Sequence, residues 1–283
     1  MTYPPPNDHV PVDLDASDWS QLEPLYQSLI DRELKCAGCL EQLLIDRSEL
    51  DAAAGEAQAN LYIRMTCHTD DEEATRAYLD FVEQVEPKLK DISFKLDRHI
   101  MQCPHLDDLD SDRYGVYMRN LQANIDLFRE ENIPLQTEDT KLGQKYDEIN
   151  GAMTVEFQGE ERTMPQMGRF VQVTDRAVRE SAWTAMVTRR YEDHERIDSI
   201  FDEMVKLRHQ VALNAGHENF MEYAFAAMHR FDYRPEDCRQ FHEAARSICV
   251  PVYHQLNAER AAALDLDSLR PWDLEVDIQG RDP

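Results

Sequence analysis

Glycine and positive charge are both scarce in this sequence. Only 9 of its 283 residues are glycine, whereas alanine, leucine, glutamate, glutamine and arginine are abundant, so the composition favours helices over sheets. Lysine and arginine number 30 against 56 acidic residues, which gives a net charge of −26. A surface this negative argues against nucleic acid or an anionic membrane as a partner. It suits a soluble protein and is compatible with cationic or small peptide ligands.

Long apolar runs are absent as well. No stretch of about 18 apolar residues occurs, so we expect no transmembrane span. The first residues lack the basic and apolar regions of a signal peptide, and we therefore predict a cytoplasmic protein. Its 6 cysteines are then expected to be free thiols. Cys36 and Cys39 form a Cys-x-x-Cys pair within a helical pattern, but without a second such pair or two histidines this motif is a weak signal for a redox or zinc site.

The longest helical pattern runs from Thr174 to Tyr233. Thr174 is the expected N-cap, with Asp175 in the first turn, and Gly216 is placed to end the pattern. The polar run at 192–196 predicts that two helices meet there. Neighbouring helices must cover the apolar stripe of this stretch. Its members are Val178, Ala182, Met186, Ile197, Ile200, Phe201, Met204, Val205 and Val211.

Capping residues and prolines mark further helices. Ser17 is a predicted N-cap, and Thr69 is another, in a capping box with Glu72. Pro235 fits the first turn of a later helix, where its missing N–H costs nothing. Pro251 is expected to kink that helix or to begin a new one.

One β-hairpin is expected in this otherwise helical chain, at about 152–164. Alternate residues there are apolar, and Gly159-Glu160 fits a two-residue turn. The hairpin is expected to cap a helical layer; contact with a ligand at a cleft edge is the alternative. A terminal extended segment is predicted at about 272–279. The predicted fold is therefore mainly α, a multi-helix array with one hairpin and this extended segment. The alternating apolar residues of the two segments are Met153, Val155 and Phe157, then Leu274, Val276 and Ile278.

The sequence contains no recognisable active site of its own. A zinc peptidase of the His-Glu-x-x-His type needs two histidines one helical turn apart. The three His-Glu pairs begin at His194, His217 and His242, and each lacks the second histidine. We therefore predict no catalytic, metal or cofactor-binding residue. The fourth positions of these pairs hold Asp198, Met221 and Arg246.

Four segments, in order, resemble the amino-terminal half of oligoendopeptidase F, in the thimet-oligopeptidase-like family of zinc metallopeptidases. The most specific are "LRHQVALNAGHENFMEYAF", "RFDY" and "RPWDL", which occur in combination. The full segments are "LFREENIPLQTEDTKLGQKYDEINGAMTVEFQGEERTMPQM", "DRAVRESAW", "VKLRHQVALNAGHENFMEYAFAAMHRFDYRPEDCRQFH" and "VPVYHQLNAERAAALDLDSLRPWDL". The likeness covers most of residues 15–283.

The resemblance implies a mostly helical shell around a deep channel that admits short peptides and excludes folded proteins. In that family, zinc held by a His-Glu-x-x-His pair and a downstream Glu activates water to hydrolyse internal peptide bonds. The motif lies well after the Pro-Trp-Asp segment, here Pro271–Asp273, and this sequence ends before reaching it. No site residue can therefore be carried over to any position, and we expect zinc in the full-length family but none bound to this chain.

The resemblance also divides the chain. We expect an extended arm at 1–15, a helical amino-terminal region with the hairpin at 16–195, and the start of the helical catalytic domain at 196–283, truncated before the zinc motif. The first hypothesis is the amino-terminal part of an oligoendopeptidase, inactive alone, with apolar surface exposed where its missing carboxyl-terminal half would pack. The alternative is a non-catalytic helical peptide- or protein-binding module. An unrelated acidic scaffold is hard to reconcile with the four ordered segments.

Overall fold

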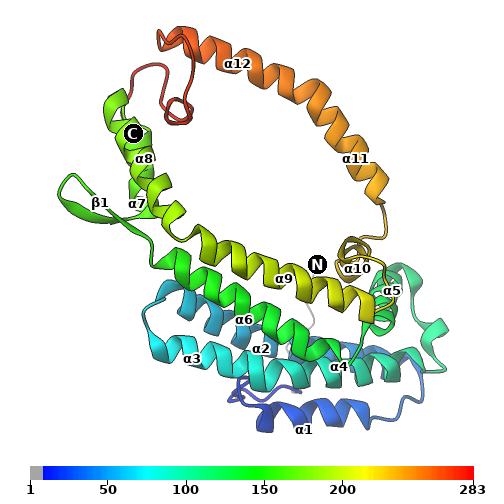
Figure 1. The fold of residues 1–283 in the computed structure, drawn as a ribbon. Coiled ribbons are helices and arrows are strands. Elements are labelled where there is room, and N and C mark those ends of the chain that lie inside the picture. The colour runs from blue at the N-terminus through cyan, green and yellow to red at the C-terminus, as the bar shows by residue number, and fades with distance from the viewer. Residues whose placement is uncertain (1–8) are drawn as a thin grey trace. The chain divides into compact units, whose positions relative to one another are not determined.

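The computed structural model describes residues 9–283 and confirms the predicted mainly α fold with one hairpin (Figure 1). Its contacts divide the chain into two units. The first holds the described residues up to Glu148 together with Ile200–Arg230, and the second holds Ile149–Ser199 and Phe231–Pro283. Of the arm predicted at 1–15, residues 1–8 lie outside the described residues. The domain boundary predicted at 195 stays a prediction.

The helices are distributed over both units. None of them, within residues 9–283, is both long and apolar enough to cross a membrane. The first unit contains α1 (Trp19–Ile30), α2 (Ala37–Cys67), α3 (Glu72–Asp80), α4 (Glu86–Met101), α5 (Ser111–Leu127) and α10 (Phe220–Ala227). The second unit contains α7 (Met164–Met167), α8 (Arg176–Glu192), α11 (Pro235–Ala244) and α12 (Val250–Ala263). Two helices continue from one unit into the other, α6 (Asn132–Gly151) and α9 (His194–Asn214).

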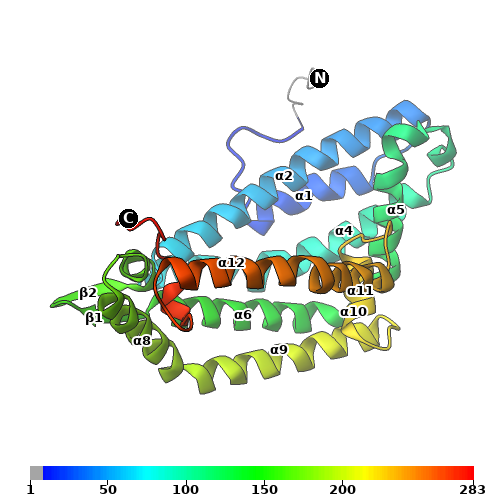
Figure 2. The same cartoon turned by 90° about the horizontal axis from the view of Figure 1, so that it is seen from above.

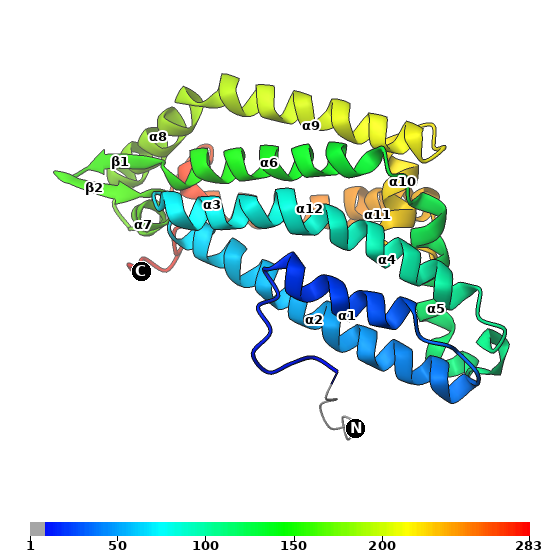
Figure 3. The ribbon, with the colours of Figure 1, turned by 90° about the horizontal axis from the view of Figure 1, so that it is seen from below.

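The core of the first unit lies between α1, α2 and α4, which run side by side, and α5, which packs against α4 (Figure 3). Arg47 of α2 enters this core, and its Nη1 lies 2.6 Å from Asp97 Oδ1 on α4. Both ionic side chains are buried, so each depends on the other to offset its lost hydration. The apolar core residues that are fully buried include Leu22, Leu29, Leu40, Leu43, Leu50, Leu96 and Ile100.

Aspartates cap three helices for which the sequence predicted serine or threonine. The predicted N-caps Ser17, Thr69 and Thr174 are wrong by one or two positions, and the capping box from Thr69 to Glu72 does not form. In each case a carboxylate accepts backbone N–H groups of the first turn. A carboxylate adds a negative charge at the positive end of the helix to the capping hydrogen bond, which favours it over a hydroxyl. The capping residues are Asp18, Asp71 and Asp175.

Two prolines each follow a π-helical turn. The turn at Phe81–Val85 precedes Pro87, and the turn at Ala245–Cys249 precedes Pro251. In both, the residue before the proline donates its N–H to the carbonyl five residues back. Proline cannot donate the ordinary bond to the fourth residue back, so the helix widens by one residue just before it. Pro251, predicted to kink or restart its helix, is accommodated in this way next to the start of α12.

The hairpin pairs β1 (Thr154–Phe157) with β2 (Glu160–Thr163), antiparallel, as predicted. Phe157 lies opposite Glu160, so the turn residues are Gln158 and Gly159, with φ of 55° and 79°. Two positive φ values define a type I′ turn. The predicted turn at Gly159-Glu160 is therefore wrong by one residue. Phe157 is buried against Phe170, with ring centroids 5.1 Å apart.

The long helical pattern is broken where the sequence predicted it, between α8 and α9. The carboxylate of Asp193, between them, lies 2.7 Å from Arg189 and 2.9 Å from Arg196. Hydrogen bonds from Arg189 first and then Arg196 lower the pKa of Asp193. Gly216 follows α9 with φ of 86°, the left-handed conformation expected of it.

Residues 272–279 do not form the predicted extended segment. Pro271–Asp273 form a single 3₁₀ turn, and bends and turns follow. Val276 is buried, and its carbonyl accepts a hydrogen bond from Arg260 Nη1 at 2.6 Å. This hydrogen bond from the Arg260 side chain and the burial of Asp273 described below replace the pairing that a strand would need. Alternation over so few residues did not distinguish a strand from an irregular segment with one buried side chain.

We predict that Leu43→Ala lowers the free energy of unfolding by about 2–5 kcal/mol, because it leaves a cavity among fully buried side chains. Ile63→Ala on the same helix is the control, since Ile63 is 55% exposed, and it should change stability by less than about 0.5 kcal/mol. Urea denaturation followed by circular dichroism measures both. Equal losses would contradict this assignment of the core.

Candidate functional site

The three His-Glu pairs of the sequence lie on helices or at their ends, in separate local contacts. His194 stacks on Tyr191 with ring centroids 4.1 Å apart, and His217 makes an edge contact with Tyr223 at 6.0 Å. Glu243, which follows the third histidine, accepts two hydrogen bonds from Arg246 at 2.6 and 2.8 Å and forms a local ion pair with it. Within residues 9–283, no three His, Cys, Asp or Glu side chains gather in a way that could hold a metal ion.

The Pro-Trp-Asp segment forms the most highly constrained polar cluster in the second unit. Asp273 is 0% exposed. Its carboxylate accepts hydrogen bonds from Arg176 at 2.9 and 3.0 Å, from Arg179 at 3.1 Å and from the Arg270 N–H at 2.9 Å. Both arginines that donate from their side chains belong to α8. The cluster therefore fixes the segment that follows α12 onto α8.

Arg179 also binds backbone carbonyls on either side of the cluster in the sequence. Its Nε donates to the Trp272 carbonyl at 2.8 Å, and its Nη1 donates to the carbonyls of Val173 and Thr174 at 2.9 Å each. The ring of Trp272 also contacts Trp183 of α8, with centroids 5.3 Å apart. All donor groups of this buried guanidinium are thus directed at acceptors on two different chain segments.

The charge of Asp273 is strongly stabilised in the folded protein. Burial by itself would raise the pKa of this carboxyl group, but hydrogen bonds from Arg176, the Arg270 N–H and Arg179 outweigh it and lower the pKa to about 2. Because this value lies below the ordinary 3.8, the group stabilises the folded state above pH 3.8. That contribution is lost as the pH falls from 3.8 through about 2.

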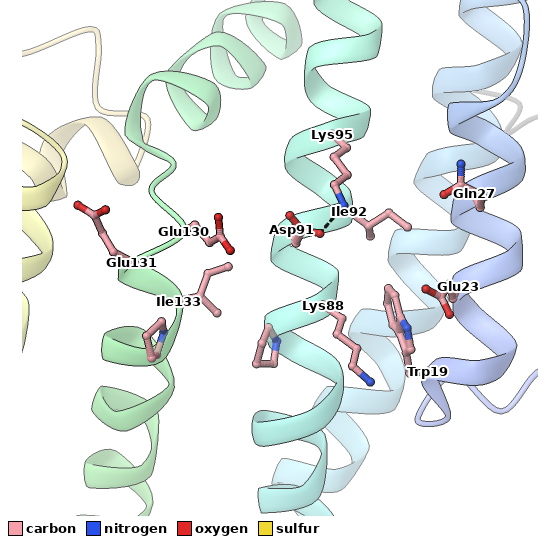
Figure 4. A pocket seen from close by; sticks show the side chains of 12 residues that line it. Trp19, Glu23, Gln27, Lys88, Asp91, Ile92, Lys95, Glu130, Glu131 and Ile133 are labelled. Atoms are coloured by element: carbon pink, nitrogen blue, oxygen red, sulfur yellow. Dashed lines mark hydrogen bonds and ion pairs between the residues drawn. The ribbon is translucent and has the colours of Figure 1, made fainter.

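A groove of about 1010 Å³ opens in the first unit between α1, α4 and the turn that precedes α6 (Figure 4). Lys88 lies over the ring of Trp19 at 5.8 Å from its centroid, and Lys95 pairs with Asp91 at 2.6 Å. No sequence motif marks this groove, because its walls come from three distant segments. Its lining residues are Trp19, Glu23, Gln27, Pro87, Lys88, Asp91, Ile92, Lys95, Glu130, Glu131, Ile133 and Pro134.

Large apolar side chains are exposed along α11 and α12, a region we call the α11–α12 face. Figures 1 and 2 show these helices as one continuous rod, joined by the π-helical turn, and none of its residues is buried. Phe241 is 72% exposed and Ile248 is 66% exposed. Val252 and Leu256 are four residues apart, a spacing that places both on one side of α12. The members of the face are Phe241, Ile248, Val252, Tyr253 and Leu256.

The apolar stripe predicted to be covered on α9 is fully covered only at its end, and Ile197, Ile200 and Met204 are half-buried. Val211 is buried, whereas Phe201 is 60% exposed and Val205 is also exposed. A hydrogen bond joins this buried end of α9 to α6, because Asn132 Nδ2 donates to the Val211 carbonyl at 3.0 Å. Exposed apolar patches of this kind mark surfaces that another chain or segment covers.

Two family models match the chain. Residues 11–128 match the peptidase M3 N-terminal domain, and residues 169–279 match peptidase family M3. No curated protein matches the sequence.

Solved structures share the fold. An oligoendopeptidase F from Bacillus anthracis is 23% identical with a TM-score of 0.86 over 94% of this chain and 49% of that one. PZ peptidase A with an inhibitor is 24% identical, with a TM-score of 0.86 over 94% and 47%. Oligoendopeptidase-F from Enterococcus faecium is 14% identical, with a TM-score of 0.68 over 92% and 56%. The chain therefore spans about half the length of these structures.

We predict that Asp273→Asn lowers the free energy of unfolding by about 3–5 kcal/mol at neutral pH, because it leaves Arg179 buried without its counter-ion. The difference from the unsubstituted chain should shrink as the pH falls from 3.8 towards about 2, where Asp273 itself takes up a proton.

Asp277→Asn is the control for this variant. Asp277 pairs with exposed Arg281 on the same segment, so its replacement should cost less than about 1 kcal/mol. Denaturant unfolding at several pH values measures all three proteins. A loss in Asp273→Asn that stays constant down to pH 2 would contradict the role given to the Asp273 charge.

Proposed function

Because this chain belongs to peptidase family M3, we propose that it is the amino-terminal part of a zinc metalloendopeptidase that hydrolyses internal bonds of short peptides. The observation that carries the proposal is the match of both family models, in order, to a chain that spans about half of its solved relatives. On this proposal the chain by itself is inactive.

The residues present do not fit a zinc site of the His-Glu-x-x-His type. Each His-Glu pair has a different residue where the second histidine is needed, and Glu243 is already bound to Arg246. We therefore assign no chemical step to this chain. The zinc ligands and the general base belong, on this proposal, to a carboxyl-terminal half that these residues do not include.

The contribution of this chain is structural, as one wall of a peptide-binding enzyme. Burying a large apolar side chain is worth about 1.5–3 kcal/mol. The exposed side chains of the α11–α12 face, together with Phe201 and Val205, would therefore supply a driving force for packing against the other half. Oligopeptides are the substrate class, and a cytoplasmic location agrees with the six free cysteines.

A non-catalytic helical binding module is the second candidate. The groove beside Trp19 favours it, because it offers an aromatic wall and three glutamates within the first unit alone. Such a module would bind peptides without any further chain. The two candidates therefore differ in whether a catalytic half exists.

We predict that the chain alone does not cleave a quenched oligopeptide, with or without added zinc. The coding frame after Pro283 should encode a His-Glu-x-x-His motif and a downstream Glu, and co-expression of that segment should restore chelator-sensitive cleavage. Zinc-dependent cleavage by the chain alone would overturn the proposed inactivity. Absence of the motif in every frame would replace the proposal with the binding module.

We predict further that the double substitution Phe241→Ser and Ile248→Ser weakens binding of the co-expressed segment at least about tenfold, since each side chain contributes more than about 1.4 kcal/mol when buried. The control is Ile63→Ser with Val116→Ser, which removes exposed apolar groups from other helices. Affinity is measured by pull-down titration, and stability by denaturation. Equal weakening by both pairs would show that the α11–α12 face is not the docking surface.

A further inference from the structure

Two cysteines lie one turn apart at the start of α2, the 31-residue helix of the first unit. Cys36 is the N-cap of α2, and Cys39 lies at position N3 of the same helix. The N–H of Cys39 donates to Cys36 Sγ over 3.2 Å. Both thiols are free; Cys36 is exposed, and Cys39 is partly exposed. The pair therefore lies in the first turn of α2 rather than inside a helix.

Cys36 caps α2 as the first residue of a capping box does, since its sulfur accepts the N–H of Cys39 at N3. The side chains at N-cap and N3 lie on the same side of this first turn. Two cysteine side chains on the same side of one helical turn are the arrangement from which a disulfide closes with little backbone movement.

The two thiols differ in their electrostatic surroundings. Hydrogen bonds from the Cys39 thiol and then from backbone N–H groups lower the pKa of Cys36. The interaction with Cys36 raises the pKa of Cys39. The helix N-terminus favours negative charge at the N-cap. Cys36 is thus the thiol that ionises more readily and acts as the nucleophile, and Cys39 is the thiol that can resolve an adduct on it.

We propose that Cys36 and Cys39 form a redox-active dithiol that reduces low-molecular-weight disulfides and closes into an intramolecular disulfide at the start of α2. The Cys36 thiolate attacks one sulfur of the small disulfide, whose S–S bond breaks, and the first small thiolate leaves and takes a proton. Cys39 then gives its proton to solvent and attacks the Cys36 sulfur. The second small thiolate leaves, so two electrons have passed from the dithiol to the small disulfide.

A zinc site is not the better explanation of the pair. Zinc needs further ligands, and in the described part of the chain no third His, Cys, Asp or Glu joins these two as a possible ligand. The reactivity proposed for the pair can be distinguished from the general reactivity of an exposed thiol by comparison with Cys67. This residue lies at the other end of α2, is exposed and has no second cysteine one turn away.

The test uses the full chain and oxidised glutathione as the probe, with alkylation of remaining thiols and mass spectrometry. The peptide that contains Cys36 and Cys39 should lose two hydrogens and resist alkylation, with release of two reduced glutathione molecules per chain. In Cys39→Ser, a glutathione adduct should persist on Cys36. Cys36→Ser should form neither product, and a serine hydroxyl is itself a good N-cap, so this variant keeps its fold.

Cys67→Ser is the matched control and should leave the product unchanged. In the unsubstituted chain, iodoacetamide at pH 7 should alkylate Cys36 at least about tenfold faster than Cys67. A stable glutathione adduct on Cys36 in the unsubstituted chain, with no intramolecular disulfide, would overturn the proposal. Equal alkylation rates at Cys36 and Cys67 would overturn it as well.

Discussion

The burial of Asp273 against two arginines is the interaction on which the second unit depends. A buried carboxylate is tolerated only when its lost hydration is replaced, and here Arg176, Arg179 and the Arg270 N–H replace it. Arg179 in turn binds carbonyls on both sides of the cluster. The start of α8 and the segment after α12 are therefore held together as one structure. The same bonds explain why that segment is a 3₁₀ turn and not a strand.

The functional interpretation depends on the exposed apolar side chains of the α11–α12 face. In the first unit, α1, α2, α4 and α5 enclose a core of fully buried leucines, whereas the α11–α12 face buries none of its residues. A helix whose apolar stripe faces solvent gains its stability from a partner. That contrast supports the proposed packing of the α11–α12 face against a further segment, and the chain spans about half the length of its solved relatives. The cysteine pair on α2 lies in the first unit, so the reaction proposed for it does not depend on the α11–α12 face.

Much of the local structure could be predicted because it depends on neighbours in the sequence. The helical periodicity, the hairpin and the break at Asp193 follow from such patterns. The predicted N-caps were wrong where two neighbouring residues could both cap the helix, as when Asp175 caps α8 in place of Thr174. The turn moved by one residue because the pairing of Phe157 with Glu160 set the register. Single-residue positions depend on small energy differences that a pattern does not resolve.

The sequence by itself determined the helical fold class, the likeness to peptidase family M3 and the lack of a His-Glu-x-x-His motif. These depend on composition, periodicity and residue identity alone. Only the tertiary structure decided that Asp273 is buried beneath α8, that Phe241 and Ile248 face solvent, and that a groove opens beside Trp19. It also placed Cys36 and Cys39 at the first turn of a helix. Burial and the contact of distant segments depend on how the helices pack. The same apolar periodicity occurs in a helix whose apolar face is covered and in one whose apolar face is exposed, so the periodicity alone does not tell them apart.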